Sequence, residues 1–304
     1  MKDGILAINK PAGISSAGVV ARVKRVLGVK KIGHTGTLDP FATGLLLIAV
    51  QKATRISRFF LNGSKHYTAR VTLGVETDTY DCTGKIVFEA DPGVVTAISP
   101  EDVQQVVAGF SGSQEQIPPS FSALKHKGQP LYKLARKGEM IKKPPRKIEI
   151  YAISVQHMDL PEFEMDVHCS GGTYIRSLAY DIGKKLNCGA HLSGLCRTKS
   201  SAFDLNAAIG LGDLEKMAPQ EIEPYILPMS DCLAFLPGIQ ADTALEKKIS
   251  YGQKLSTKEI APLLPPDIAP APFIKVVDFS DKLLALIEPD KEGSLYNYCC
   301  VFTG

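Results

Sequence analysis

One short segment of the chain combines an acidic side chain with a backbone that must bend sharply. Asp39 lies within residues 30–43, which are rich in Gly, Thr and Pro, and Pro40 follows it directly. Loops carry catalytic groups more often than cores do, so Asp39 is the first candidate nucleophile. An Asp-Pro pair is also typical of an ordinary turn, which is the plain structural alternative. No Gly-Lys-Ser/Thr motif follows these glycines, which disfavours a nucleoside triphosphatase.

Three further side chains could act together with Asp39. Arg176 falls in the first turn of an expected helix, where its guanidinium and the positive helix end would both favour an anion. A carboxylate paired with it would stay ionised with a depressed pKa, although a structural ion pair or a surface arginine would leave the same pattern. Tyr67 is either a cross-strand ring or a surface on which a nucleobase stacks. His34 could cap a turn, insert into a base stack or bind a metal, and the lack of a second His at ligand spacing disfavours the metal.

Positive charge is concentrated inside the chain rather than spread along it. The formal net charge is only +3, but residues 211–304 carry 14 acidic and 8 basic side chains, which leaves +9 for residues 1–210. Residues 120–150 hold nine cations against two acidic side chains, and Gly and Pro interrupt the run. A solvated face is the alternative, but this pattern favours a projecting arm that contacts phosphates. The cations expected on the RNA backbone are Lys125, Lys127, Lys133, Arg136 and Lys137.

Composition excludes several classes of protein. A chain of 304 residues that is 44% hydrophobic is long enough for a packed core and a second, smaller domain. Its longest aliphatic stretch, residues 45–50, is far shorter than the roughly 20 apolar residues of a membrane helix. The first residues include a charge pair and a proline, which is unlike a signal peptide. Seven scattered cysteines predict neither a disulfide framework nor a zinc site, so we expect a cytoplasmic protein.

Residue patterns predict an α+β fold with a mixed, mainly antiparallel sheet. Strands are expected at 4–9 and 67–75, and an antiparallel hairpin at 147–169. Helices are expected from Ser15 or Ser16 to Gly28, after Ser99, and from Gly171 to Leu186, whereas residues 30–43 are expected to form a loop. The composition changes near Gly238, with late strands at 273–277 and 283–288 and a proline-rich loop at 262–272. We therefore expect a main domain at 1–237, with an inserted arm at about 115–147, and a small β-rich domain at 238–304.

Several ordered motifs together resemble the bacterial TruB family of tRNA pseudouridine synthases, along nearly all of residues 1–210. The motifs are Asn9-Lys10-Pro11 with Gly13-Ile14-Ser15-Ser16, Gly33-His34-Thr35-Gly36-Thr37-Leu38-Asp39-Pro40 through Gly44-Leu45-Leu46, Lys65-His66-Tyr67, Thr77-Asp78-Thr79-Tyr80-Asp81, Pro118-Pro119 with Phe121-Ser122-Ala123, Cys169-Ser170-Gly171-Gly172-Thr173-Tyr174-Ile175-Arg176, and Cys188-Gly189-Ala190-His191. The chain departs from the family pattern at Gly171, where a lysine is common, and at Cys196, where a second arginine is common.

The resemblance implies a fold, a reaction and a role for each candidate residue. It implies isomerisation of uridine 55 in the T-loop of tRNA to pseudouridine, without cofactor or metal. Asp39 matches the aspartate that attacks the uridine at C1′ or C6, and Arg176 the arginine that pairs with it. Tyr67 matches the ring that stacks on the base and takes part in proton removal, and His34 the residue inserted where the base leaves. Tyr174 and Leu195 match residues that line the uridine pocket.

The resemblance also implies how the enzyme would hold its RNA. The basic insertion would fold over the RNA as a thumb, and the last domain is similar to a PUA module that contacts the acceptor end. We expect a monomer with tRNA as its partner, no membrane contact and no obligate protein partner. Two other functions compete with this one. A related synthase depends on a guide RNA, whereas the basic arm here favours a standalone enzyme; a non-catalytic tRNA-binding or tRNA-folding module would not need Asp39 with Arg176.

Overall fold

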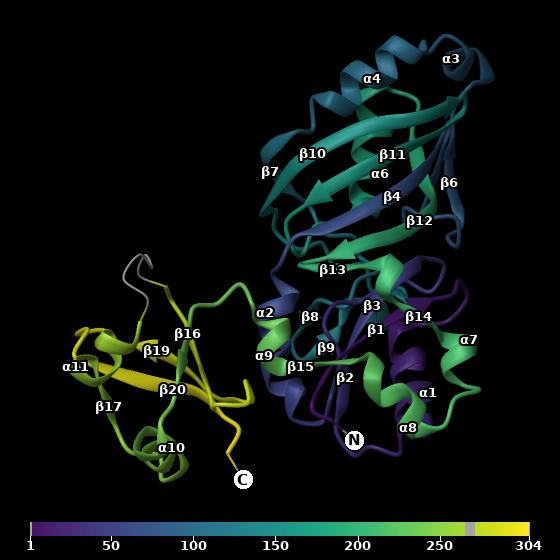
Figure 1. Cartoon of the computed structure of the whole chain (residues 1–304). Coiled ribbons are helices and arrows are strands. Elements are labelled where there is room, and N and C mark those ends of the chain that lie inside the picture. The colour runs from purple at the N-terminus through teal and green to yellow at the C-terminus, as the bar shows by residue number, and fades with distance from the viewer. Residues whose placement is uncertain (1, 265–270, 304) are drawn as a thin grey trace.

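The computed structural model describes residues 2–264 and 271–303 and contains two separate large sheets (Figure 1). The first sheet has 11 strands, and its main path runs in the order β14-β1-β3-β12-β4-β11-β10-β7. All of its pairings are antiparallel except β1 with β14 and β12 with β3, so the predicted mixed, mainly antiparallel sheet is confirmed. Its strands are β1 (Gly4–Lys10), β2 (Ile32–His34), β3 (Thr43–Val50), β4 (Lys65–Leu73), β7 (Gly112–Gln116), β10 (Arg146–Asp159), β11 (Glu162–Cys169), β12 (Ala190–Ser200), β13 (Phe203–Asp204), β14 (Ile209–Gly210) and β15 (Ile226–Pro228).

Helices lie on both faces of this sheet and connect its strands. Helix α1 begins after the Ser15 cap and ends at Gly28, whose φ of 64° is left-handed, as the sequence predicts. The capping box at Ser99 that opens α4 is also present. Four short 3₁₀ helices cover 51–56, 205–207, 223–225 and 261–263. The helices are α1 (Ser16–Leu27), α2 (Ser57–Leu61), α3 (Pro92–Thr96), α4 (Pro100–Ala108), α5 (Leu131–Ala135), α6 (Ile175–Lys185), α7 (Leu211–Leu214), α8 (Pro219–Ile222) and α9 (Met229–Cys232).

Two local predictions differ from the structure. The segment 30–43 is not a loop throughout, because β2 pairs Ile32 with Val50 and His34 with Ile48 of β3. A three-residue strand is too short to show a periodicity of its own. Helix α6 begins at Ile175 rather than at Gly171, since Gly172 has a φ of 88° and therefore belongs to the turn before the helix.

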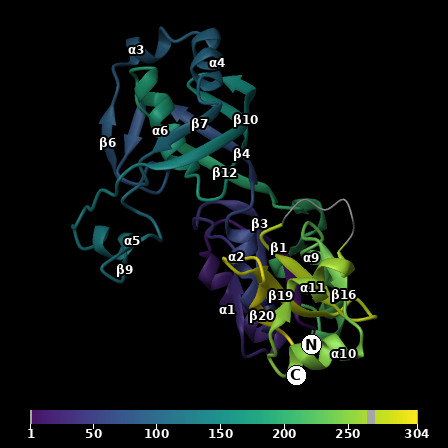
Figure 2. The same ribbon diagram turned by 90° about the vertical axis from the view of Figure 1, so that its left-hand side faces the viewer.

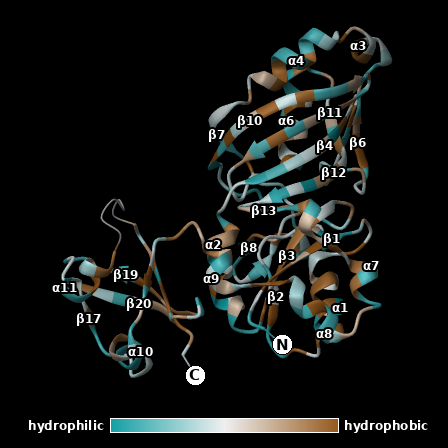
Figure 3. Cartoon of the chain, in the orientation of Figure 1, coloured by the Kyte–Doolittle hydropathy of each residue, from teal (hydrophilic) through white to brown (hydrophobic). Residues whose placement is uncertain are grey.

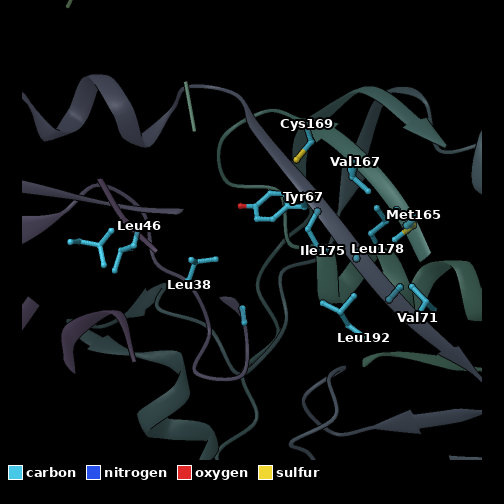
Figure 4. Packing of buried hydrophobic residues seen from close by; sticks show 14 of the residues in the cluster. Leu38, Leu46, Tyr67, Val71, Met165, Val167, Cys169, Ile175, Leu178 and Leu192 are labelled. Carbon is cyan, nitrogen blue, oxygen red and sulfur yellow. The ribbon is translucent and has the colours of Figure 1, made fainter. Parts of the chain in front are cut away.

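A continuous apolar core fills the space between the sheet and its helices. It combines every second residue of β4, such as Ala69 and Val71, with Val19 and Val23 of α1 and with Leu178 and Ile182 of α6. Figure 4 shows part of this cluster, with Tyr67 between Leu38 on one side and Ile175 on the other. Figure 3 shows the same pattern as hydrophobic stretches along β1 and β3. The core thus extends directly to the segment that carries Asp39.

The second sheet has five strands in the order β16-β18-β19-β20-β17. These strands are β16 (Gly238–Gln240), β17 (Leu255–Ser256), β18 (Ile274–Val277), β19 (Leu283–Pro289) and β20 (Leu295–Val301), with helices α10 (Thr243–Ser250) and α11 (Thr257–Ile260). The strands expected at 273–277 and 283–288 are present as β18 and β19. Part of the expected proline-rich loop, residues 265–270, lies outside the described residues.

The second sheet packs against the main sheet at β1, β3 and α2. Ile5 and Leu47 of the main sheet share an apolar cluster with Leu286 and Phe302. Cations surround this contact: Lys52 Nζ donates to the Phe302 carbonyl over 3.1 Å, and the Arg58 guanidinium lies 5.2 Å from the Phe273 ring centroid.

The insertion between β7 and β10 carries the hairpin strands β8 (Lys125–His126) and β9 (Gln129–Pro130) with α5, and it projects away from the second sheet (Figure 2). Strands β5 (Val75–Thr77) and β6 (Ile86–Glu89) form a further small hairpin.

The contact of α6 with β12 leaves no room for a side chain at Gly183. A Cβ built there would lie 2.2 Å from the Ala190 amide nitrogen. We expect Gly183→Ala to reduce the free energy of unfolding by about 1–3 kcal/mol, as overpacking does, measured by urea denaturation. Gly212→Ala is the matched control, because a Cβ at Gly212 would meet no atom within 4 Å. Equal stability of the two variants would contradict this account of the packing.

Candidate active site

The loop that carries Asp39 is fixed by two buried polar side chains. Ser16 Oγ donates to the Leu38 carbonyl and accepts from the Leu38 amide, both over 2.8 Å. Lys10 is fully buried, and its ammonium donates to the carbonyls of Pro11, Ile14 and Pro40. Burial lowers the pKa of Lys10 to about 8. Both residues next to Asp39 are therefore held in place from α1 and β1.

Arg176 lies between two carboxylates. Its Nε is 2.9 Å from Asp39 Oδ2, and one terminal nitrogen is 3.3 Å from Asp39 Oδ1. The other terminal nitrogen is 3.3 Å from Asp81 Oδ2 and donates to the Thr79 carbonyl. The side chains of Arg176 and Asp81 are 4% and 5% exposed, whereas that of Asp39 is 31% exposed. Asp39 is therefore the one carboxylate of this group with an edge that a substrate can reach.

The pKa of Asp39 is raised, not depressed as the sequence analysis expected. Burial of the carboxyl is the main cause; Arg176 opposes it, and the nearby Asp81 carboxylate adds to the rise. The prediction was wrong because the burial of the Asp39 carboxyl outweighs its ion pair with Arg176. Arg176 also divides its charge between two carboxylates in this desolvated site.

Tyr67 and Arg197 form the wall of the site on the sheet. They are register partners on β4 and β12, and both are buried. Burial raises the pKa of Tyr67, so its phenol is neutral. Arg197 donates to the carbonyls of Gly36, Thr37 and Leu45, which ties the loop before Asp39 to the sheet. Leu195 lies two residues along β12, on the same face as Arg197.

His34 closes the turn at the start of this loop. Its Nδ1 accepts from the Gly36 amide over 3.4 Å, which is the turn-capping arrangement that the sequence analysis allowed. Burial and the nearby Arg197 lower the pKa of His34, so the ring is neutral. Among the described residues, no group of three or more His, Cys, Asp or Glu side chains is placed to hold a metal ion.

Tyr174 caps α6 two residues before Arg176, and its main chain is held by Gln116. The Gln116 amide donates to the Tyr174 carbonyl over 2.9 Å, and its oxygen accepts from the Tyr174 amide over 2.8 Å. Gly171 lies in the turn just before, where a Cβ would come within 2.6 Å of the Leu61 carbonyl oxygen. A larger residue at Gly171 would therefore collide with the backbone at the end of α2.

The basic arm begins next to Arg176, but its cationic side chains lie further along the arm, outside the site. The Phe121 carbonyl accepts from Arg176 over 2.8 Å, which anchors the start of the arm. Further along, Lys125, Lys127, Lys133, Arg136 and Lys137 are exposed, and none of them forms an ion pair with any residue in 2–264 or 271–303. Arg136 lies over the Tyr132 ring at 5.7 Å. These cations are free to meet an external anion.

Several residues that build this site have no role predicted from the sequence. Asp81 and Lys10 stand in the quoted motifs, and Arg197 follows Leu195, but their partners become visible only once the strands are paired. A usable signal exists for one of them. Lys10 is a cation inside a strand that is otherwise largely apolar and buried, and a charge at such a position needs polar partners.

All seven cysteines are free. Within the described part of the chain, no helix is long and apolar enough to cross a membrane.

Two family models match consecutive parts of the chain. Residues 24–175 match the TruB family pseudouridylate synthase N-terminal domain, and residues 176–234 match the tRNA pseudouridylate synthase B C-terminal domain. Among curated relatives, tRNA pseudouridine synthase B of Clostridium tetani is 40% identical over 96% of this chain and 97% of its own. That of Syntrophotalea carbinolica is 43% identical over 82% of this chain and 81% of its own.

Solved structures share the fold across almost the whole chain. A chain in the crystal structure of a Cbf5-Nop10-Gar1 complex is 26% identical, with a TM-score of 0.75 over 99% of this chain and 85% of its own. A chain in the structure of an H/ACA RNP bound to a substrate RNA is 25% identical, with a TM-score of 0.73 and the same coverage. The predicted α+β fold with a separate C-terminal sheet is thus confirmed.

Removing the Arg176 side chain should destabilise the folded protein, because two carboxylates would lose their shared cation. We expect Arg176→Ala to lower the free energy of unfolding by about 3–5 kcal/mol in urea denaturation at pH 7. Arg176→Ala combined with Asp81→Asn should recover part of the loss, since the second change removes the more deeply buried charge. A loss below about 1 kcal/mol, or no recovery in the double variant, would contradict the charge balance described here.

Proposed function

Because the chain belongs to the TruB family of pseudouridylate synthases, we propose that it converts uridine 55 in the T-loop of tRNA to pseudouridine, with Asp39 as the nucleophile. Formation of pseudouridine in tRNA is the activity of its curated relatives. The observation that carries the proposal is the Asp39 carboxylate, which is held by Arg176 at 2.9 Å and is accessible on one side. A non-catalytic module would have no use for an anchored, partly desolvated carboxylate.

The reaction is an isomerisation whose atoms balance within the nucleotide. The Asp39 carboxylate adds to C1′ or to C6, and the glycosidic C1′–N1 bond breaks. The uracil ring turns, C5 bonds to C1′, and Asp39 is released. The proton on C5 leaves and N1 gains one, so no redox partner is needed. Burial makes the Asp39 carboxylate a stronger nucleophile, because little water has to be displaced from it before it attacks. Arg176 keeps the carboxylate oriented.

The residues around Asp39 are suited to bind a uracil base that has flipped out of the RNA stack. Tyr67 offers a ring beside Asp39, and we propose that it stacks on the base and takes part in removal of the C5 proton. Tyr174 and Leu195 are proposed as further walls of the uridine pocket. His34 is neutral, which supports its proposed insertion into the space that the base leaves, because an uncharged ring stacks there without bringing a buried charge. The cost of flipping, a few kcal/mol, would be offset by stacking and burial of the uracil.

RNA binding is assigned to the basic arm and the C-terminal unit. The exposed cations of the arm (about 115–147) would contact phosphates and close over the T-arm as a thumb. Residues 238–304 are proposed as a PUA-like unit that reaches the acceptor end, beside the main domain at 1–237. We further propose that the enzyme acts as a monomer in the cytoplasm, without an obligate protein partner.

A guide-RNA-dependent synthase is the second candidate, supported by the likeness to the chain of an H/ACA RNP. The identity of 25% to that chain is well below the 37–49% shared with the standalone tRNA enzymes. The built-in basic arm also favours a protein that grips its RNA unaided. Activity on tRNA without any added guide RNA separates the two candidates.

Asp39→Asn should abolish turnover while leaving binding almost intact. Phosphate contacts dominate affinity for RNA, so we expect the Kd for a T-arm stem-loop to change by less than about tenfold. Turnover is measured as tritium release from uridine labelled at C5, since substitution at C5 frees that label. Asp159→Asn, at an exposed position, is the matched control. Parallel loss of binding and turnover in Asp39→Asn would count against the nucleophile assignment.

Neutralising the arm should weaken binding and reduce its dependence on salt. For Lys125→Gln with Lys127→Gln and Lys133→Gln, we expect the slope of log Kd against log salt to fall by about 0.9 for each duplex phosphate that the arm no longer neutralises. The measurement is fluorescence anisotropy of the stem-loop between low and moderate KCl. Lys24→Gln with Arg25→Gln, exposed in α1, is the control. An unchanged slope in the arm variant would place the RNA surface elsewhere.

A further inference from the structure

Arg146 is the first residue of β10, at the point where the basic arm returns to the sheet. Its guanidinium carbon lies 4.5 Å from the centroid of the Tyr174 ring, the ring proposed above for the uridine pocket. The same side chain passes over the turn before α6, where a Cβ at Gly172 would be 3.5 Å from an Arg146 terminal nitrogen. Arg146 therefore borders the proposed pocket without belonging to the Asp39 and Arg176 pair.

The guanidinium of Arg146 has donors that nothing in the described chain accepts. Its Nε and one terminal nitrogen are buried and have no hydrogen-bond partner, and no carboxylate of a described residue forms an ion pair with it. Buried polar groups are nearly always paired, and a guanidinium has five donors and no acceptor. Unpaired donors at the edge of a binding site indicate a missing acceptor.

Fixing Tyr174 does not by itself account for Arg146. Gln116, the register partner of Arg146 on β7, already holds the Tyr174 main chain with two hydrogen bonds. Stacking on the Tyr174 ring uses the flat face of the guanidinium and does not satisfy its N–H donors. The ring thus orients a half-buried guanidinium whose Nε and one terminal nitrogen still lack an acceptor among the described residues.

We propose that Arg146 binds a phosphodiester group of the RNA next to the uridine that enters the pocket; the proposal rests on the function proposed above. Arginine is always charged, and its planar fork matches two phosphate oxygens at once. The neighbouring arm is rich in exposed cations, so the approaching molecule is a polyanion. By gripping the backbone beside the flipped nucleotide, Arg146 positions the substrate while Tyr174 receives the base.

The test combines protein variants with RNA in which single phosphates are neutral. T-arm stem-loops carry one methylphosphonate at each phosphate flanking the target uridine in turn. Binding is followed by anisotropy and turnover by tritium release, for wild type, Arg146→Met and Arg146→Lys. Arg25→Met, at an exposed arginine on α1, is the matched control, and thermal unfolding checks that each variant is folded.

We expect Arg146→Met to weaken binding of unmodified RNA by about 10- to 100-fold, as loss of hydrogen bonds between charged groups does. Its salt slope should fall by about 0.7, the value for one single-stranded phosphate. One methylphosphonate should weaken binding by wild type but not by Arg146→Met, and Arg146→Lys should keep the salt slope while losing part of the affinity.

Other results would overturn the proposal. If Arg146→Met keeps the wild-type salt slope and the wild-type response to every methylphosphonate, Arg146 only supports the Tyr174 ring, even if turnover falls. A failure of the proposed function looks different, because wild type would then release no tritium from any stem-loop. The binding measurements on the same RNAs would still decide whether Arg146 contacts a phosphate.

Discussion

A buried guanidinium determines how the whole site is arranged. Arg176 has almost no contact with solvent, so its charge is tolerable only if anions and carbonyls surround it. Those partners come from distant segments: the loop before β3 gives Asp39, the turn after β5 gives Asp81 and the Thr79 carbonyl, and the start of the arm gives the Phe121 carbonyl. Arg176 on α6 has its full set of partners only when all three segments have packed against the helix. The active site is therefore complete only in the folded domain.

The other buried cations around the site do not bind carboxylates, so none of them competes with Arg176 for Asp39. Lys10, Lys65 and Arg197 are all bound to main-chain carbonyls rather than to carboxylates. Burial lowers the pKa of both lysines to about 8. Lys65 holds the turn between α2 and β4, whereas Arg197 and Lys10 both hold the loop that carries Asp39. The site thus has more cations than anions, which suits a polyanionic substrate.

Local signals were enough to predict much of the fold but not the charge balance of the site. The cap at Ser15, the left-handed Gly28 and the hairpin of β10 with β11 could be predicted because each depends on residues close in sequence. The pairing of Tyr67 with Arg197 could not, since it depends on strand order. Burial of the Asp39 carboxyl, with a smaller contribution from Asp81, explains the wrong prediction about the pKa of Asp39, because both become visible only in three dimensions. The functional assignments came from motif order rather than from periodicity.

The strand order of the main sheet has a consequence for the newly made chain. Strand β12 lies between β3 and β4, which follow each other in the chain, joined by residues 51–64, yet do not pair. Strands β14 and β15 then add to β1, the first strand made. An emerging chain therefore cannot close its sheet until the segment that contains Arg197 leaves the ribosome. The early strands must wait with unpaired edges, so assembly of this domain is late, non-local and dependent on completing nearly all of its length.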